Sequence, residues 1–152
     1  MNTKIRNFFT AISIVLLAAI VIVQNPARAE AKVQDGKYYF SPCTVTKFQI
    51  KNGTLVLKVD KDRMGGITKD NDKNQKTYKL KVKVAKNCKY RFMEYNRGTG
   101  ESSSGKTNYK KIKEAISVNR SFYKETGSAS NVADSCIEVK GNKVVKITYV
   151  AM

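Results

Sequence analysis

The sequence predicts a small, mainly β domain with one short helix (α+β), arranged as a partly open Greek-key barrel of the OB type. Two observations carry this prediction. Several short segments alternate apolar and polar residues between turn residues, which is typical of half-buried strands. One later segment has helical spacing, and a hairpin pattern follows it. This order, with a long bent first strand, fits such a barrel better than a sandwich, which needs more strands.

Residues 1–29 have the pattern of a secretory signal peptide, which we expect to be helical. Lys4 and Arg6 precede an uncharged run over residues 8–23, and an A-x-A cleavage site follows at residues 27–29. The run is shorter than the roughly 20 residues of a comfortable membrane span, so we expect cleavage after this site. An uncleaved N-terminal anchor is the alternative. Either way, residues 30–152 are predicted to be one basic β-rich domain that is exported, extracellular or extracytoplasmic.

The first strands are predicted between residues 37 and 59. A strand begins at residues 37–40, and Pro42 marks a bend or an edge. Asn52-Gly53 is a strong two-residue turn signal. It pairs apolar residues across the hairpin and gives the hairpin one apolar face. The predicted pairs are Ile50 with Leu55 and Phe48 with Leu57.

The middle of the chain continues this pattern. After a polar connection at residues 60–76, the strand at residues 77–84 places its apolar residues inside and its lysines outside. Residues 89–95 are predicted as a further strand and residues 96–104 as a Gly/Ser loop. The predicted outward lysines are Lys79, Lys81 and Lys83.

A helix and a final hairpin complete the domain. Asn108 can cap a helix that we expect to reach about Val118. The closing hairpin spans residues 135–140 and 144–150 around Gly141-Asn142. A simple two-residue loop would place Ile137 opposite Lys146, so we predict a bulge or a longer loop. The register then pairs Val139 with Val145 and Ile137 with Ile147.

The charge of the domain points to anionic partners. Of the 29 Lys and Arg residues, 26 remain after residue 29 against 12 acids, which gives the mature domain a net charge of +14. We therefore expect a non-enzymatic binding module that contacts an anionic polymer or an envelope surface. Nucleic acid fits the same charge, without sequence specificity. The candidate ligand-binding residues are Lys79, Lys81, Lys83, Lys89, Arg91, Lys110, Lys111 and Lys113.

Aromatic residues stand beside many of these cations, as in Lys37-Tyr38-Tyr39 and in residues 89–92. Two interpretations follow. The rings could form an exposed platform for bases or sugars. Alternatively, they pack inward while the cations face water, which the spacing around Tyr78 favours. A third view of the whole domain is purely structural, with charge that only keeps it soluble.

Residues 100–107 read GESSSGKT and satisfy the nucleotide-binding pattern G-x-x-x-x-G-K-S/T. A nucleotide- or phosphate-binding protein is therefore an alternative, with Gly105, Lys106 and Thr107 as an anion loop. The preceding strand is charged, and no apolar run ending in Asp follows the loop. A plain connector is the preferred interpretation.

Enzyme chemistry has little support in the sequence. The chain contains no His, which removes Ser-His, Cys-His and imidazole metal sites. Asp70-x-Asp72-x-Asn74 resembles a calcium loop, but lysines surround it and the sixth position is not Gly. We expect no cofactor and no metal. If one disulfide forms, the predicted pair is Cys43 with Cys136, while oligomeric state cannot be derived from the sequence.

Overall fold

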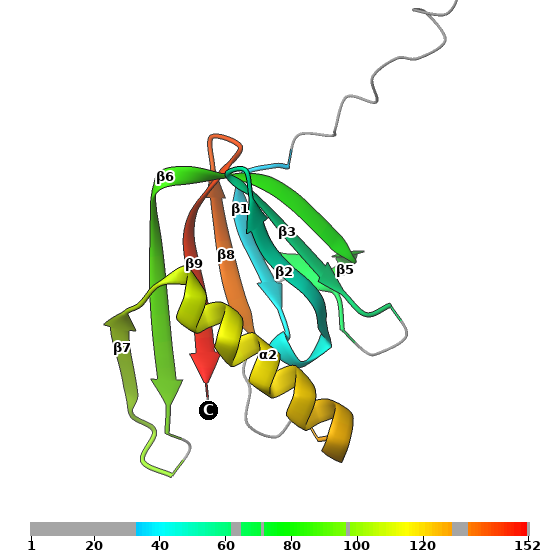
Figure 1. Cartoon of the computed structure of the whole chain (residues 1–152), viewed down its shortest axis with the longest axis vertical. Helices are drawn as coiled ribbons and strands as arrows, with labels where there is room; N and C mark the ends of the chain where they lie inside the picture. Colours follow the sequence, from blue (N-terminus) through cyan, green and yellow to red (C-terminus); the bar gives the residue numbers. More distant parts are fainter. Residues whose placement is uncertain (1–32, 62–64, 71, 97, 129–133, 152) are drawn as a thin grey trace, which may run out of the picture. The chain divides into compact units, whose positions relative to one another are not determined.

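The computed structural model describes residues 33–151, with gaps at 62–64, 71, 97 and 129–133. The predicted signal peptide lies outside the described residues. The described part is mostly β with one long helix (Figure 1). This confirms the mainly β class with a single helix.

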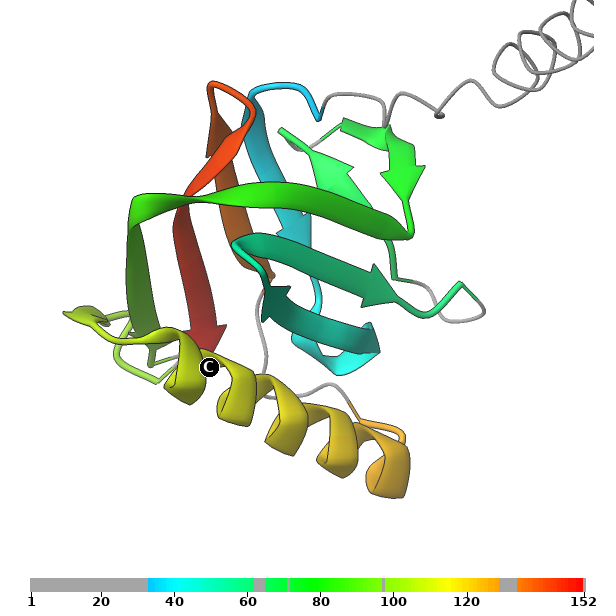
Figure 2. The same cartoon turned by 45° about the horizontal axis from the view of Figure 1, so that its top comes forward.

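Nine strands can be followed in the described residues, and they form one curled sheet (Figures 1 and 2). Their spatial order is β2-β3-β6-β9-β8-β1-β4-β5, and β7 pairs with β6 outside this order. Seven strands precede the helix, more than the sequence suggested. β4 and β5 lie largely within the expected polar connection, and β7 begins within the expected Gly/Ser loop at residues 96–104. The strands are β1 Gly36–Phe40, β2 Val45–Lys51, β3 Thr54–Val59, β4 Ile67–Lys69, β5 Asp72–Thr77, β6 Lys79–Tyr95, β7 Ser102–Lys106, β8 Ser135–Lys140 and β9 Lys143–Ala151.

Strand β6 turns the corner of the sheet, as Figure 2 shows. Its first half pairs with β3 antiparallel, and its second half pairs with β9 in parallel. From Val84 to Lys89 it advances five residues, while β9 advances only two, from Val144 to Lys146. The extra residues bend the strand as a bulge does. The two strands expected at 77–84 and 89–95 are therefore one continuous strand.

The start of the domain is also bent. Strand β1 is followed by the 3-10 turn η1 (Pro42–Thr44) and then by β2. β1 pairs with β8, whereas β2 pairs with β3. Pro42 therefore lies at the bend that the sequence predicted, and the bend carries the chain from one part of the curled sheet to another.

The first hairpin has the predicted register. Phe48 lies opposite Leu57 and Ile50 opposite Leu55. Asn52 and Gly53 have φ of 50° and 67°, the left-handed pair that a tight hairpin turn requires. The turn residues and the apolar alternation favour the same register, so the register follows from residues that are close in sequence.

The closing hairpin is confirmed in part. Ile137 lies opposite Ile147, as expected, and the strands contain a bulge. Val139 lies opposite Val144 and not Val145, so that predicted pair is wrong. The turn has two residues, with Gly141 and Asn142 both at positive φ. The extra residue therefore sits within the strand, next to the turn, and not in the loop.

Helix α2 (Tyr109–Thr126) is longer than predicted. Asn108 caps it, accepting a hydrogen bond from the Lys111 amide at 3.0 Å, as expected. It continues past Val118 to Gly127, whose φ of 69° ends it. Ile112 and Ile116 are buried and anchor the helix on the core.

Two α2 side chains also cover the edge of β2. The Tyr109 hydroxyl accepts a hydrogen bond from the Ile50 amide at 3.0 Å, and the Arg120 guanidinium donates to the Thr46 carbonyl at 3.1 Å. An uncovered strand edge is a template for unwanted pairing, so these contacts protect the sheet.

The core lies inside the curl and holds most of the rings. Phe40, Phe48 and Tyr149 are buried, and Phe92 stacks on Tyr149 with 5.2 Å between ring centroids. Tyr38 is 6% exposed. The inward interpretation of the aromatic residues is therefore correct for these rings, and a broad exposed ring platform is not present among the residues described.

The three cysteines are free thiols. Cys43 is buried within the core, whereas Cys136 lies on the outer side of β8, because its neighbours Ser135 and Ile137 point inward. The structure contains no bridge between them. Cys43 belongs to the turn η1 and Cys136 to the outer side of β8.

Candidate functional site

The outer face of β2, β3, the first half of β6 and the start of β9 carries a set of exposed lysines, which we call the lysine face. Cross-strand register places several of them side by side. One row aligns Lys47, Lys58 and Lys79, and a second aligns Lys83 with Lys143. Neighbouring strands lie about 4.8 Å apart, so the lysine side chains of a row start from adjacent backbone positions. The lysine face consists of Lys47, Lys51, Lys58, Lys79, Lys81, Lys83 and Lys143.

Acids are absent from the strand positions of this face. The other outward positions are Gln49, Thr54 and Val56. Like charges directly opposite each other on a sheet destabilise it. The arrangement therefore costs folding free energy, and it concentrates positive potential where an anion can approach.

The structure divides the eight predicted binding residues into three groups. Lys79, Lys81 and Lys83 belong to the lysine face. Lys89 and Arg91 follow the bend of β6, where Lys89 lies opposite Lys146 of β9. The helix lysines are exposed on α2, which packs on the inner side of the sheet. The helix lies along the edge of β2, so its lysines belong to a separate element and are not aligned with the rows of the lysine face. The helix lysines are Lys110, Lys111 and Lys113.

The GESSSGKT segment is largely a strand. Gly105 lies opposite Phe92, and Lys106 opposite Arg91. The Thr107 amide donates to the Tyr90 carbonyl at 3.1 Å. A phosphate cradle needs consecutive amides that converge on one point, whereas an extended strand directs successive amides to opposite sides. The backbone therefore differs from the expected anion loop.

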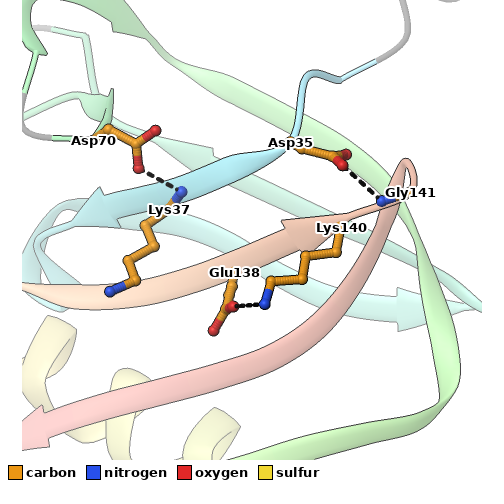
Figure 3. Close-up of polar contacts among 6 residues, drawn as sticks. All are labelled: Asp35, Lys37, Asp70, Glu138, Lys140 and Gly141. Atoms are coloured by element: carbon orange, nitrogen blue, oxygen red, sulfur yellow. Dashed lines mark hydrogen bonds and ion pairs between the residues drawn. The ribbon is translucent and has the colours of Figure 1, made fainter.

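A second charged region lies where β1, β8 and the β8–β9 turn meet (Figure 3), and we call it the charged corner. The Asp35 carboxylate accepts hydrogen bonds from the Gly141 and Asn142 amides at 2.9 and 3.1 Å. Asp70 accepts one from the Lys37 amide at 2.7 Å. No local sequence pattern indicated this cluster, because its members come from three separate segments.

At the charged corner, acidic and basic side chains lie close together and neutralise one another. The Lys140 amine lies 3.0 Å from the Glu138 carboxylate (Figure 3). Hydrogen bonds from the turn amides, followed by nearby lysines, lower the pKa of Asp35 below its ordinary value of 3.8. The hydrogen bond from Lys140 lowers the pKa of Glu138. Both carboxylates are thus held in their charged form.

Gly36 makes the corner possible. Its φ is 145°, and a Cβ at this position would meet the Asp70 carboxylate at 2.7 Å. A residue with a side chain would displace that carboxylate from the Lys37 amide. The glycine therefore allows β1 to approach Asp70 closely.

Two hollows adjoin the charged corner on the outer face of β1 and β8. The larger has a volume of about 620 Å³ and is lined by the corner residues together with Tyr39. The smaller, of about 210 Å³, extends across β8 to β9. Lys37, Tyr39 and Glu138 line both. The remaining residues of the smaller hollow are Met93, Asp134, Cys136, Lys146, Thr148 and Val150.

Neither a metal centre nor a membrane helix stands out in the described part of the chain. No group of three or more His, Cys, Asp or Glu side chains is arranged to hold a metal ion there. Within the same residues, no helix combines the length and apolar composition of a membrane span.

Comparison of the chain with protein-family models, with curated proteins and with solved structures gave no significant match.

Proposed function

We propose that the protein is an exported, non-enzymatic module that binds anionic polymers or surfaces through the lysine face. The observation that carries this proposal is the row of Lys47, Lys58 and Lys79, aligned across three strands without an acid at the strand positions of the face. Such a row costs stability. A bound polyanion offsets that repulsion and releases its own counterions, which favours binding.

We further infer that the domain is an OB-type barrel. The order β2-β3-β6-β9-β8-β1 supports this if β1 and β2 count as the two halves of one bent strand. The barrel then has five strands, with a parallel pair between the third and fifth and a helix before the last two. The β4–β5 hairpin and β7 are additions to that plan.

This inference strengthens the proposed location of the site. OB barrels bind oligonucleotides and oligosaccharides on the face of their second and third strands and on the loops L12 and L45. In this chain those strands are β3 and β6, and those loops are the turns at residues 52–53 and 141–142. The lysine face covers β3 and the first half of β6 and extends to both turns through Lys51 and Lys143, while the turn at residues 141–142 itself belongs to the charged corner. Function depends on the residues of a site and not on the fold alone, so the lysines themselves are the object of the test.

The test compares two triple variants with equal loss of charge. The strand variant changes Lys79, Lys81 and Lys83 to Gln, and the helix variant changes Lys110, Lys111 and Lys113 to Gln. Binding to heparin, single-stranded DNA and anionic vesicles is titrated at two ionic strengths. We expect the strand variant to lose more affinity and to show a shallower salt dependence, because its lysines share one face.

Three results would contradict the proposal. Undetectable binding of the native domain to all three probes at low salt would favour the purely structural alternative. Equal losses in both variants would indicate that net charge acts without a site. Protection from thermal unfolding by ATP, but not by heparin, would favour the alternative based on the Gly100–Thr107 segment.

A further inference from the structure

The smaller hollow on the outer face of β1, β8 and β9 has features that the lysine face lacks. Its volume of about 210 Å³ is below the roughly 300–1,000 Å³ of pockets for drug-sized ligands. It therefore suits one ring-sized group. Thr148 is only 7% exposed, and Met93 and Val150 supply apolar walls.

Lysines outnumber acids in the strand row that crosses the hollow. The register aligns Lys37, Glu138, Lys146 and Lys89 in this row, which gives three lysines and one acid. Glu138 is also paired with Lys140 at 3.0 Å. One carboxylate therefore neutralises these lysines only in part, which favours an anionic group beside them.

The rest of the lining favours a hydroxylated ring. Tyr39 lies in the row next to Lys37 and presents a half-buried ring, which can stack on an apolar ring face. Asp134 and Glu138 supply carboxylate oxygens that accept hydrogen bonds from hydroxyl groups. They repel a doubly charged phosphate more strongly than a singly charged carboxylate. A ring that carries both a carboxylate and hydroxyl donors matches this mixture.

We propose that this hollow binds one carboxylated sugar unit, so that the anionic polymer recognised by the protein is an acidic polysaccharide. The inference rests on the proposed function, because it names the partner of that surface. Continuity of the faces supports it: Lys83 and Lys143 of the lysine face precede Lys89 and Lys146 along the same strand pair. A chain lying across the lysines could place one unit in the hollow. Nucleic acid is disfavoured, because the outward positions of the lysine face hold no aromatic ring for base stacking.

Cys136 provides a built-in reporter, since its thiol lines the hollow and is partly exposed. The mature domain is treated with a thiol reagent, and modification of each cysteine is followed by peptide mass spectrometry. D-glucuronate, glucose, sulfate and adenosine monophosphate are compared as protecting ligands. We expect glucuronate alone to slow the reaction of Cys136, while Cys88, at the bend of β6, reacts unchanged.

Two substitutions test whether the positive charge at the hollow is responsible for the protection. Lys146→Gln should raise the half-protecting glucuronate concentration about tenfold, the effect of losing one charge-assisted hydrogen bond. Lys124→Gln, on an exposed turn of α2, removes the same charge and should have no effect. Equal protection by sulfate would reduce the hollow to a simple anion site and overturn the sugar proposal. Stronger protection by adenosine monophosphate would replace it with a nucleotide, and no protection by any probe would reject the hollow. Each of these results leaves the lysine-face titration with heparin unaffected, so the two proposals fail separately.

Discussion

The lysine face and the charged corner lie on the same sheet but arrange their charged side chains differently. Like charges are neighbours on the lysine face, and opposite charges are neighbours at the charged corner. On the lysine face, Lys58 sits between two other lysines. At the corner, Glu138 sits between Lys37 and Lys146 and also pairs with Lys140. Cross-strand neighbours of opposite charge stabilise a sheet, and like charges destabilise it. The charged corner therefore stabilises the folded domain, whereas the lysine face destabilises it and is offset by the rest of the domain.

A high net positive charge can serve solubility or binding, and these two roles predict different arrangements of the lysines. A charge that served only solubility would be satisfied by lysines mixed with acids, as at the corner. Alignment of lysines in rows is not needed for that purpose. The rows are what an extended anionic partner would contact, since several of its charges meet several amines at once.

The largest effect on binding should come from introducing an acid on the lysine face, so that opposite charges face each other as they do at the charged corner. Lys83→Glu places an acid directly opposite Lys143. Removing one positive charge and adding one negative charge should weaken heparin binding roughly 30-fold, at about 1 kcal/mol per charge near an anionic surface. The same change should raise the free energy of unfolding by a few tenths of a kcal/mol.

Isothermal titration and urea denaturation measure the two quantities. Lys124→Glu serves as the matched control for net charge, because it makes the same change in charge on α2. Weaker binding that is equal in both variants would mean that the position of the charge does not matter.

A smaller effect, on the free energy of unfolding, is expected when the charged corner loses the hydrogen bond from the Lys37 amide to Asp70. Asp70→Ala removes the acceptor of the Lys37 amide and leaves residue 70 at a φ of 45°, which Ala adopts poorly. We expect a loss of about 1–2 kcal/mol in the free energy of unfolding. Asp70→Asn keeps an acceptor and tolerates this backbone, so it should lose less. Urea denaturation ranks the variants, and equal losses would show that the hydrogen bond and the backbone preference contribute little.

The smallest effect concerns pH. Because the folded state lowers the pKa of Asp35, this carboxylate stabilises the domain above its ordinary pKa of 3.8, and the contribution is lost as the pH falls through the lower folded value. Asp35→Asn should therefore be less stable than the native domain at neutral pH. The difference should shrink below about pH 4. Thermal unfolding between pH 2 and 7 measures it, and a constant difference across that range would rule out titration of Asp35 as its source.

Local patterns explain which parts of the fold were predictable. The β2–β3 hairpin combines a strong turn with matched alternation, so its register follows from adjacent residues. The start of helix α2 at Asn108 was predicted, but the helix continues past Val118 to Gly127, which is the first residue in a left-handed conformation. A bulge near Gly141-Asn142 was expected, and the structure places it between Glu138 and Val139, so Val139 pairs with Val144.

The candidate site was predictable only in outline. Alternation assigned Lys79, Lys81 and Lys83 to an outer face, but their partners in the rows come from β2, β3 and β9 and required the sheet register. The helix lysines were grouped with them because net charge carries no information about which residues are aligned across the strands of a sheet. The hollow beside Tyr39 left no local pattern, since its lining comes from four strands and the residue before β8.

The sequence by itself determined the β class, the turns, the start of the helix, the outward direction of the strand lysines and the excess of positive charge. These properties depend on residues that are neighbours along the chain, where turn preference, capping and period-two alternation act directly. Only the tertiary structure decided the bend of β6, the alignment of lysines in rows, the placement of the helix along the edge of β2 and the charged corner. Each of these depends on which strands meet, and burial of the whole core selects that pairing.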